Sequence, residues 1–384
     1  MLLIPPQADK WETSDKALKR GSIYIMKDSV SSEHRPDGND TTGSQVSVLP
    51  PGHNCLTRRS AIKAALASAS AVAFGSRARA ETTKRRPDPR KGSPKRYAMK
   101  KSINQWAFPY PERMNLKECL QLAKDAGFDG IELNYDLEND LSPKSETKDY
   151  HDIRRLADKI GIRISGLCSF LFWPYPLTSN DPDKRAKGME LAGKIAEAAR
   201  DLGVENVLLV PGAVDIPWRD DYEPVPNDVC DRRAKEAVRK LARQAERLRV
   251  CLNIENIFFS GYLMTPMEMN DFVDSFQSEH VKIHFDTGNI SIFQHPEHWV
   301  RLMGKRIKNT HFKEFSKKST DYSLETFRPL LDGTTNWPAV MEELDEVGYR
   351  GYVTFEYFHP YPHYPEALIY QTSDSLDRIL GRIS

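Results

Sequence analysis

From residue 100 onward, short apolar runs alternate with longer stretches in which apolar residues recur every three or four positions. The short runs are rich in β-branched and aromatic residues, which favour strands, whereas the wider spacing is typical of amphipathic helices. The pattern predicts strands at 102–107, 130–134, 162–168, 206–210, 250–255, 282–286, 307–312 and 351–355. Between them it predicts helices that include 116–126, 150–160, 184–202, 229–249, 266–276 and 337–347.

Glycines separate these predicted elements. Four of them, Gly127, Gly161, Gly203 and Gly348, follow a predicted helix and precede a predicted strand, as residues that end helices often do. Eight strand–helix units within residues 100–384 suit a (β/α)8 barrel, which typically takes about 250 residues. A doubly wound sheet would carry a glycine-rich phosphate loop after its first strand, but this chain has Phe-Pro-Tyr-Pro at 108–111. We therefore expect an α/β fold, a single-domain (β/α)8 TIM barrel over residues 99–384.

The residues before this barrel follow a different pattern. Residues 1–56 are polar and rich in proline, glycine and serine, so we expect them to be disordered. Residues 57–80 combine the pair Arg58-Arg59, a weakly apolar Ala/Ser-rich stretch and an Ala-Arg-Ala end. These are the parts of a twin-arginine secretion signal. Residues 81–98 would form a basic linker, and we expect an exported, periplasmic bacterial protein whose mature chain begins at Glu81.

Two alternatives stay open at this end of the chain. A secretion signal rarely follows more than fifty residues, so either the leader is unusually long or translation starts later, for example at Met26. The Ala-rich stretch 64–75 has a second interpretation, as an amphipathic helix of the mature protein. Neither alternative changes the prediction for residues 99–384.

Composition and charge narrow the classes of function. With 16 Phe, 15 Tyr and 6 Trp, the chain as a whole is not disordered, and no apolar run approaches the ~20 residues that span a bilayer. Residues 1–96 contain 18 basic and 9 acidic residues, whereas residues 97–384 contain 37 basic and 45 acidic ones. An acidic domain is a poor match for a phosphate backbone. We therefore expect a small-molecule substrate and not nucleic acid. We also expect no stable membrane span, and a homo-oligomer stays an open alternative.

Polar residues end four consecutive predicted strands. Glu255 ends strand five, Asp286 strand six, His311 strand seven and Glu356 strand eight. Barrel enzymes have their active sites at the carboxyl ends of the strands, and neighbouring strands lie ~4.8 Å apart. Three carboxylates would repel one another without a cation. The oxygen-rich set suits one divalent metal, Mn²⁺ or Mg²⁺, with Co²⁺ or Zn²⁺ as alternatives.

The order of five short motifs resembles a known family. They are Gly-Ile-Glu-Leu at 130–133, Asn-Ile-Glu-Asn at 253–256, Phe-Asp-Thr-Gly-Asn at 285–289, His-Phe-Lys-Glu at 311–314 and Glu356 at the end of strand eight. Over residues 100–384 the chain looks like the sugar isomerase/epimerase superfamily with the xylose isomerase-like TIM barrel. Its pattern is most similar to the ketose 3-epimerases and the hydroxypyruvate isomerase-like proteins.

This resemblance implies a metal-dependent sugar isomerase or epimerase that acts on a sugar or keto acid through an enediolate intermediate. By the resemblance, the metal would be held by Glu255, Asp286, His311 and Glu356, and the acid/base pair would be Glu255 and Glu356. Candidate substrate-binding residues are Trp106, Glu132, Asn289 and Lys313. Asn289 stands where the epimerases often have a histidine, and Lys313 is among the lysines near the position of their usual arginine. The resemblance therefore implies the chemistry but not the sugar.

Other functions stay open. An endonuclease IV-like metallo-phosphodiesterase shares the barrel, but it needs three zinc ions, more histidines and a basic face. A non-catalytic, exported sugar-binding barrel is another alternative, and the pair of Glu255 and Glu356 argues against it because binding alone requires no acid/base pair. Dehydratases of the same superfamily use similar metal sites.

Some chemistry-bearing residues are expected to be structural. The cysteines of the barrel show no metal-ligand spacing and three lie in apolar settings, so we expect core residues at Cys119, Cys168, Cys230 and Cys251. His284 lies two residues before Asp286 and shares its face of the strand. It is expected either to pack in the core or to support a ligand through a hydrogen bond.

Overall fold

The structure, a computed structural model, describes residues 92–216, 219, 221–318 and 326–383. The predicted disordered segment 1–56, the predicted signal 57–80 and most of the predicted linker 81–98 lie outside the described residues. Among those described, no helix is long and apolar enough to cross a membrane. The described end of the linker lies against the C-terminal helix, because the backbone N–H groups of Ser93 and Tyr97 donate to the carbonyl oxygens of Arg378 and Leu380.

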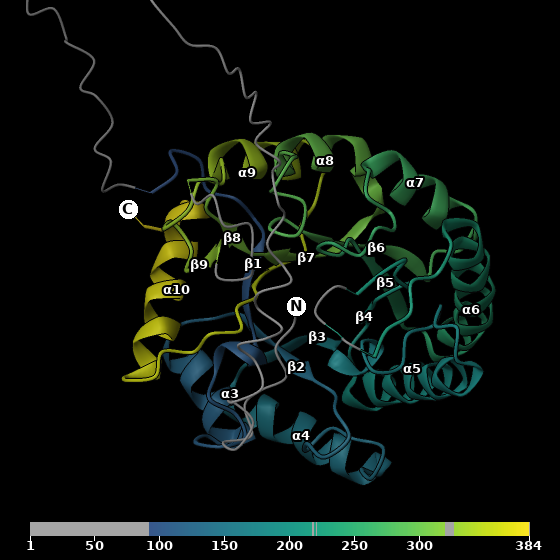
Figure 1. The fold of residues 1–384 in the computed structure, drawn as a ribbon. Helices are drawn as coiled ribbons and strands as arrows, with labels where there is room; N and C mark the ends of the chain where they lie inside the picture. The colour runs from purple at the N-terminus through teal and green to yellow at the C-terminus, as the bar shows by residue number, and fades with distance from the viewer. Residues whose placement is uncertain (1–91, 217–218, 220, 319–325, 384) are drawn as a thin grey trace, which may run out of the picture. The chain divides into compact units, whose positions relative to one another are not determined.

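Eight parallel strands close into a barrel, which confirms the predicted (β/α)8 fold class. Their order around the barrel is β1-β10-β7-β6-β5-β4-β3-β2, and Figure 1 shows the helices as a ring outside the strands. The strands are β1 (Lys100–Asn104), β2 (Gly130–Asn134), β3 (Arg163–Cys168), β4 (Asn206–Leu209), β5 (Cys251–Glu255), β6 (Val281–Asp286), β7 (Ile307–Phe312) and β10 (Tyr352–Phe355).

The outer helices are α3 (Leu116–Asp125), α4 (Thr147–Ile160), α5 (Pro182–Leu202), α6 (Asn227–Leu248), α7 (Pro266–Asp274), α8 (Pro296–Met303), α9 (Trp337–Glu346) and α10 (Pro365–Ile379). Helices α8 and α10 lie outside the helical ranges named from the sequence pattern, and the other six overlap those ranges. The connections include three short 3₁₀ turns, η3 (Gln105–Ala107), η4 (Phe170–Phe172) and η5 (Gly304–Arg306), and an antiparallel pair, β8 (Glu314–Phe315) and β9 (Phe327–Arg328).

The helix ends follow from local sequence. Gly161 and Gly203 end α4 and α5 in the left-handed conformation, with φ of 82° and 72°, which a residue without Cβ adopts at no steric cost. At the start of α3, Asn115 Oδ1 accepts the N–H of Glu118, and the Glu118 carboxylate accepts the N–H of Asn115. This reciprocal pair satisfies two N–H groups that the helix itself leaves unbonded.

The predicted bounds of the first strand, 102–107, are wrong by several residues. The strand ends at Asn104, because the Asn104 side chain accepts the N–H of Trp106 at 2.8 Å and caps the turn η3. The apolar residues that follow therefore belong to the turn and not to the strand. As a result Asn104, and not Trp106, is the residue that β1 presents at its end.

The two faces of the strands differ in chemistry. Toward the helices, Phe285 packs against Trp299 of α8 and Phe312 against Trp337 of α9, with ring centroids 6.1 and 4.7 Å apart. Inside the barrel the buried side chains are largely polar, with the Oγ atoms of Ser102 and Ser165 2.7 Å apart, and Asn253 donating to Asn206. The apolar core thus lies between strands and helices, and a polar interior supports the ends of the strands.

Candidate functional site

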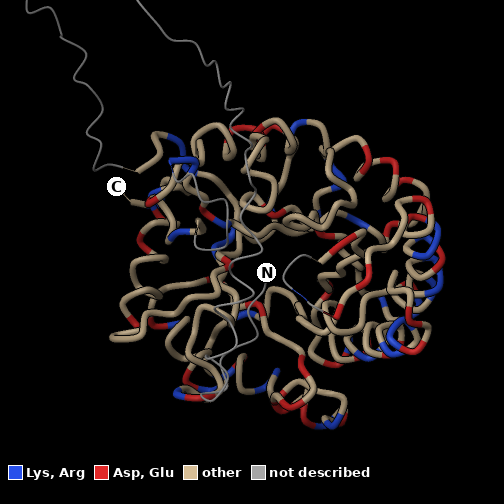
Figure 2. The backbone as a smooth tube through the Cα atoms, in the orientation of Figure 1, with Lys and Arg blue, Asp and Glu red and all other residues tan. Residues whose placement is uncertain are grey.

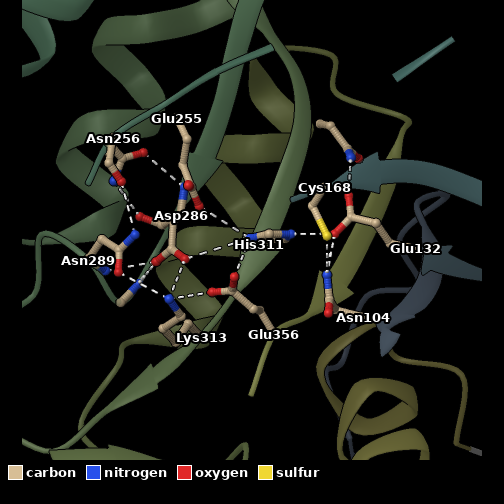
Figure 3. A network of polar contacts seen from close by, with 12 residues as sticks. Asn104, Glu132, Cys168, Glu255, Asn256, Asp286, Asn289, His311, Lys313 and Glu356 are labelled. Carbon is tan, nitrogen blue, oxygen red and sulfur yellow. Dashed lines mark hydrogen bonds and ion pairs between the residues drawn. The ribbon is translucent and has the colours of Figure 1, made fainter. Parts of the chain in front are cut away.

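Four side chains from four adjacent strands converge at one end of the barrel (Figure 3). Glu255 is the last residue of β5, Asp286 the last of β6, His311 lies near the end of β7, and Glu356 directly follows β10. The strands β5, β6, β7 and β10 are neighbours, and Asp286 is paired with His311 in the sheet. One donor atom from each of the four residues lies within 4.8 Å of the other three. The structure therefore brings together the four residues predicted as metal ligands.

The imidazole of His311 is at the centre of this cluster. Its Nδ1 atom lies 3.3 Å from Glu255 Oε1, 3.3 Å from Glu356 Oε1 and 3.9 Å from Asp286 Oδ2. Asp286 is oriented by its other oxygen, Oδ1, which accepts the backbone N–H groups of Gly288 and Asn289 at 2.8 and 2.7 Å. All four side chains are buried, with Glu255 the most exposed at 6%.

The donor set fits a divalent cation. His311 Nδ1, Asp286 Oδ2 and Glu356 Oε2 are buried atoms without a hydrogen-bond partner among the described residues, although the two oxygens are in ionic contact with Lys313. Buried polar atoms without partners are rare in folded proteins and indicate a missing ion or water. Three carboxylates and one imidazole nitrogen are ligands that Mn²⁺ or Mg²⁺ accept, so these residues could hold such an ion.

Lys313 lies directly beside the cluster. Its Nζ atom lies 3.1 Å from Asp286 Oδ2, contacts Glu356 Oε2 and donates to Asn289 Oδ1 at 3.1 Å. The rings of Phe327 and Phe358 flank the ammonium, each with its centroid 4.9 Å away. The lysine is only 4% exposed, so it places a desolvated positive charge next to two of the three carboxylates.

Burial and neighbouring charges separate the pKa values of the carboxyl groups. Burial, reinforced by the Glu356 charge, raises the pKa of Glu255 to about 7. Burial also raises the pKa of Asp286 to about 6, although the Lys313 charge opposes it. For Glu356 burial is outweighed by Lys313 and His311, which hold its pKa below the usual range. Without a metal, the cluster therefore has two carboxyl groups with raised pKa values, Glu255 and Asp286, and one with a lowered pKa, Glu356.

Glu132 lies on the other side of His311. Its Oε2 atom is 2.6 Å from His311 Nε2 and accepts the Asn104 side-chain amide at 2.7 Å, while Oε1 accepts the Asn309 amide at 3.4 Å. Glu132 is completely buried. The ring of His284 packs edge-on against His311 at a centroid distance of 4.1 Å. Figure 3 shows Glu132 and the three carboxylates of the cluster on opposite sides of the imidazole.

The other predicted substrate-binding residues surround the cluster. The Asn289 amide donates to the Asn256 carbonyl at 3.0 Å, and the Asn256 side chain in turn bonds both backbone groups of Asp286 at 2.9 Å. The Trp106 ring lies 4.0 Å from Phe170 and 5.3 Å from Phe358, so it belongs to an aromatic group beside Lys313. The substrate contacts of Trp106, Glu132, Asn289 and Lys313 stay predictions.

Sequence reasoning gave no role to several residues of this site. Phe358 lies two residues after Glu356, and Asn256 directly follows Glu255, so position beside a predicted ligand was an available signal for both. Asn104 was missed because the first strand was predicted to continue past it to residue 107, whereas β1 ends at Asn104. Asn309 shares the inward face of β7 with His311, two positions away, and this period-two spacing was the signal for it.

The chain is similar in sequence and in fold to known proteins. A family model described as xylose isomerase-like TIM barrel matches residues 120–379. An L-ribulose-5-phosphate 3-epimerase, UlaE, of Escherichia coli O1:K1 is 24% identical over 274 residues, which cover 69% of this chain and 91% of that protein. Among solved structures, an L-ribulose 3-epimerase (21% identity, TM-score 0.60) covers 74% of this chain and 96% of its own. A D-psicose 3-epimerase in the presence of D-fructose (19% identity, TM-score 0.62) covers 74% and 100%.

Proposed function

The chain belongs to the xylose isomerase-like TIM barrel family, and on this premise we propose that it is a divalent-metal-dependent sugar isomerase or epimerase. The observation that carries the proposal is the convergence of four buried donor residues, with one donor atom from each within 4.8 Å of the others, at the ends of four adjacent strands. The names of relatives at low identity, an L-ribulose-5-phosphate 3-epimerase and a D-psicose 3-epimerase, point to the same class of reaction.

The metal in this proposal is held by Glu255, Asp286, His311 and Glu356. A bound Mn²⁺ or Mg²⁺ ion would supply Lewis-acid polarisation of the carbonyl and hydroxyl oxygens of a ketose or keto acid. The burial of all four side chains excludes bulk water from the cluster, which strengthens electrostatic interactions there.

The acid/base work is assigned to Glu255 and Glu356. Their Oε1 atoms each lie 3.3 Å from His311 Nδ1, and they come from β5 and from the end of β10, with β6 and β7 between them. One carboxylate takes the proton from the carbon next to the substrate carbonyl, which leaves an enediolate. The other, protonated, returns a proton to the opposite face of that carbon, giving an epimer, or to the neighbouring carbon, giving an isomer.

Solvent deuterium exchange tests this proposal. Mn²⁺-loaded protein is incubated in D₂O with unphosphorylated ketoses, ketose phosphates and hydroxypyruvate, and loss of the alpha C–H signals is followed by NMR. We expect exchange with at least one compound and its loss in Glu255→Gln and Glu356→Gln. Asp201→Asn is the matched control, because Asp201 is a buried carboxylate of the outer helix α5 that bonds Thr147 and Arg200 and no residue of the cluster. Exchange that survives both glutamine variants would refute the assignment.

The alternative functions make different predictions. A non-catalytic sugar-binding barrel would bind a ketose without exchanging its protons. An endonuclease IV-like enzyme would cleave DNA at abasic sites, and we expect no cleavage. Among the described residues, His284 and His311 are the only histidines within groups of potential metal ligands, and Figure 2 shows acidic and basic residues interspersed along the outer helices. Both features favour a small-molecule substrate.

We also propose that the enzyme is exported to the bacterial periplasm. This part of the proposal rests only on the sequence of residues 57–80. The pair Arg58-Arg59 and the Ala-Arg-Ala end of this segment support export through the twin-arginine route. Cell fractionation and N-terminal sequencing test it, with a mature chain that begins at Glu81 as the expected result. Replacing both arginines by lysine should retain the full-length chain in the cytoplasm. A full-length wild-type chain found only in the cytoplasm would contradict this part of the proposal.

A further inference from the structure

We propose that Glu132 is a positioning residue that fixes the tautomer of His311, so that Nδ1 presents its lone pair to the metal cluster. The inference rests on the proposed metal site. It replaces direct substrate contact, the role expected for Glu132 from the sequence, with an action through the imidazole.

The contacts of Glu132 support this role. Its Oε2 atom lies 2.6 Å from His311 Nε2, a short distance typical of a hydrogen bond that involves a charged group. Asn104 donates to the same oxygen at 2.7 Å, and Asn309 donates to Oε1 at 3.4 Å. Both asparagine amides donate N–H groups, so the Glu132 carboxylate is the acceptor toward them, and we infer that it also accepts the N–H of His311 Nε2.

Glu132 contacts His311 across the barrel and not from an adjacent strand. Glu132 lies on β2 and His311 on β7, and in the strand order β1 and β10 separate these two strands. The side chain therefore reaches across the interior of the barrel and not to an adjacent strand. Asn104 is the partner of Glu132 in the pairing of β1 with β2. Its amide donates to Glu132 Oε2 and keeps this oxygen oriented toward His311.

The consequence for His311 follows from the chemistry of imidazole. A neutral imidazole carries one N–H group, and a hydrogen bond at one nitrogen determines which nitrogen remains a lone-pair donor. With Nε2–H donated to Glu132, Nδ1 is the available ligand atom, and it is the nitrogen that lies 3.3 Å from Glu255 and Glu356. A carboxylate behind a ligand histidine also raises the basicity of the ligand.

A different role for Glu132, as a ligand of a second ion, is less favourable. Glu132, His284 and His311 each have a donor atom within 4.8 Å of the others, and neither nitrogen of His284 has a hydrogen-bond partner among the described residues. Two ligands of one tetrahedral ion at ~2.0–2.1 Å lie about 3.3 Å apart. The 2.6 Å between Glu132 and His311 is too short for that arrangement and suits a proton between the two atoms.

Metal affinity and histidine NMR together test the inference. Binding of Mn²⁺ alone is measured from the EPR signal of the free ion, for wild type, Glu132→Gln and the control Asp201→Asn. The glutamine amide keeps the shape of the side chain but loses the charge, and we expect about 10- to 100-fold weaker binding. The control should bind like wild type. A Glu132→Gln protein that is folded by circular dichroism and binds Mn²⁺ within twofold of wild type would overturn the inference.

The tautomer is observed directly in protein labelled with ¹⁵N-histidine and loaded with diamagnetic Zn²⁺, with His311 signals assigned by their loss in His311→Asn. We expect a proton on Nε2 and none on Nδ1. The opposite tautomer in wild type would overturn the inference, even if Glu132→Gln fails to fold. Two ions per chain would also overturn it, because Glu132 would then be a ligand. Absence of any Mn²⁺ or Zn²⁺ binding by wild type would instead refute the proposed metal function itself.

Discussion

Lys313 gives the cluster of carboxylates a permanent positive charge of its own. Its ammonium lies against Asp286 and Glu356, between the rings of Phe327 and Phe358, with almost no exposure to solvent. A buried carboxylate without a counter-charge is costly, and the cluster contains three buried carboxyl groups, two of which contact Lys313. The lysine therefore supplies part of the positive charge that the proposed divalent cation would bring.

Replacing this lysine should destabilise the metal-free protein. We expect Lys313→Met to lower the free energy of unfolding of metal-free protein by about 3–5 kcal/mol, the range for breaking a buried ion pair. Mn²⁺ should recover part of that loss, so its stabilising effect should be larger in the variant than in wild type. Urea unfolding with and without Mn²⁺ measures both quantities.

Lys308 of β7 provides a matched control for Lys313, which directly follows the same strand. Its ammonium lies 3.0 Å from Glu205 Oε2, but the two side chains are 41% and 70% exposed. Exposed pairs contribute about 0–1 kcal/mol, so Lys308→Met should change stability by less than about 1 kcal/mol. Equal losses of unfolding free energy in Lys313→Met and Lys308→Met would show that the buried ion pairs of Lys313 stabilise the fold no more than an exposed pair does.

The buried thiols predict a loss of stability at alkaline pH. Burial raises the pKa of Cys230 to about 11 and that of Cys251 to about 12, from an ordinary value of 9.0. The stability that each thiol contributes is present below pH 9, where it is protonated in both states, and is lost as pH rises toward the folded-state pKa. Between pH 8.0 and 9.5 each should account for about 0.8 kcal/mol of lost stability.

Single variants Cys230→Ala and Cys251→Ala test this at the residue scale. Urea unfolding at the two pH values should show a smaller drop in each variant than in wild type. An unchanged drop in both would mean that these thiols titrate equally in the folded and unfolded states. The absolute stability at the lower pH is compared separately, since removing a buried sulfur also leaves a small cavity.

At the scale of elements, the helices depend on short local signals. The capping pair of Asn115 and Glu118 satisfies two N–H groups at the start of α3. We expect Asn115→Ala to lower the free energy of unfolding by about 1 kcal/mol, whereas Asn115→Asp should retain most of it, because aspartate also accepts the N–H bond and favours the helix N-terminus. Equal urea midpoints for the two variants would argue against the cap.

The same local signals explain how much of the barrel was predictable. The short runs of apolar, β-branched and aromatic residues and the glycines after the helices marked the strands, and Glu255, Asp286 and Glu356 lie where three of these strands end. The end of β1 was missed because the strand was predicted to continue through Asn104 and Gln105 to Trp106 and Ala107. The hydrogen bond of Asn104 that ends the strand is a property of side-chain geometry.

Contacts across the barrel were not predictable from the pattern. Glu132 and His311 are 179 positions apart and lie on strands that are not neighbours, so neither periodicity nor motif spacing links them. Similarly, the sequence places Lys313 after β7, but nothing in the pattern shows that its ammonium turns back onto Asp286 and Glu356. Both facts depend on how side chains fill the closed interior.

At the scale of the whole molecule, the proposed metal site joins the ends of four strands. A cation that binds only the folded barrel stabilises it by mass action, by about 2.7 kcal/mol at a free concentration of 100 times the dissociation constant. We expect Mn²⁺ to raise the unfolding temperature of wild type and a chelator to reverse the shift. In Asp286→Asn the shift should be much smaller. An equal shift in that variant would place the stabilising ion elsewhere.

The lysine beside the cluster also bears on how the protein matures in a cell. Because an internal cation already offsets part of the carboxylate charge, we expect the chain to complete its fold before the proposed metal is delivered. Metallation is in that case a separate, later event in biogenesis. The ion that occupies the proposed site is then selected by the supply that the finished barrel first encounters, and not by the supply available during synthesis.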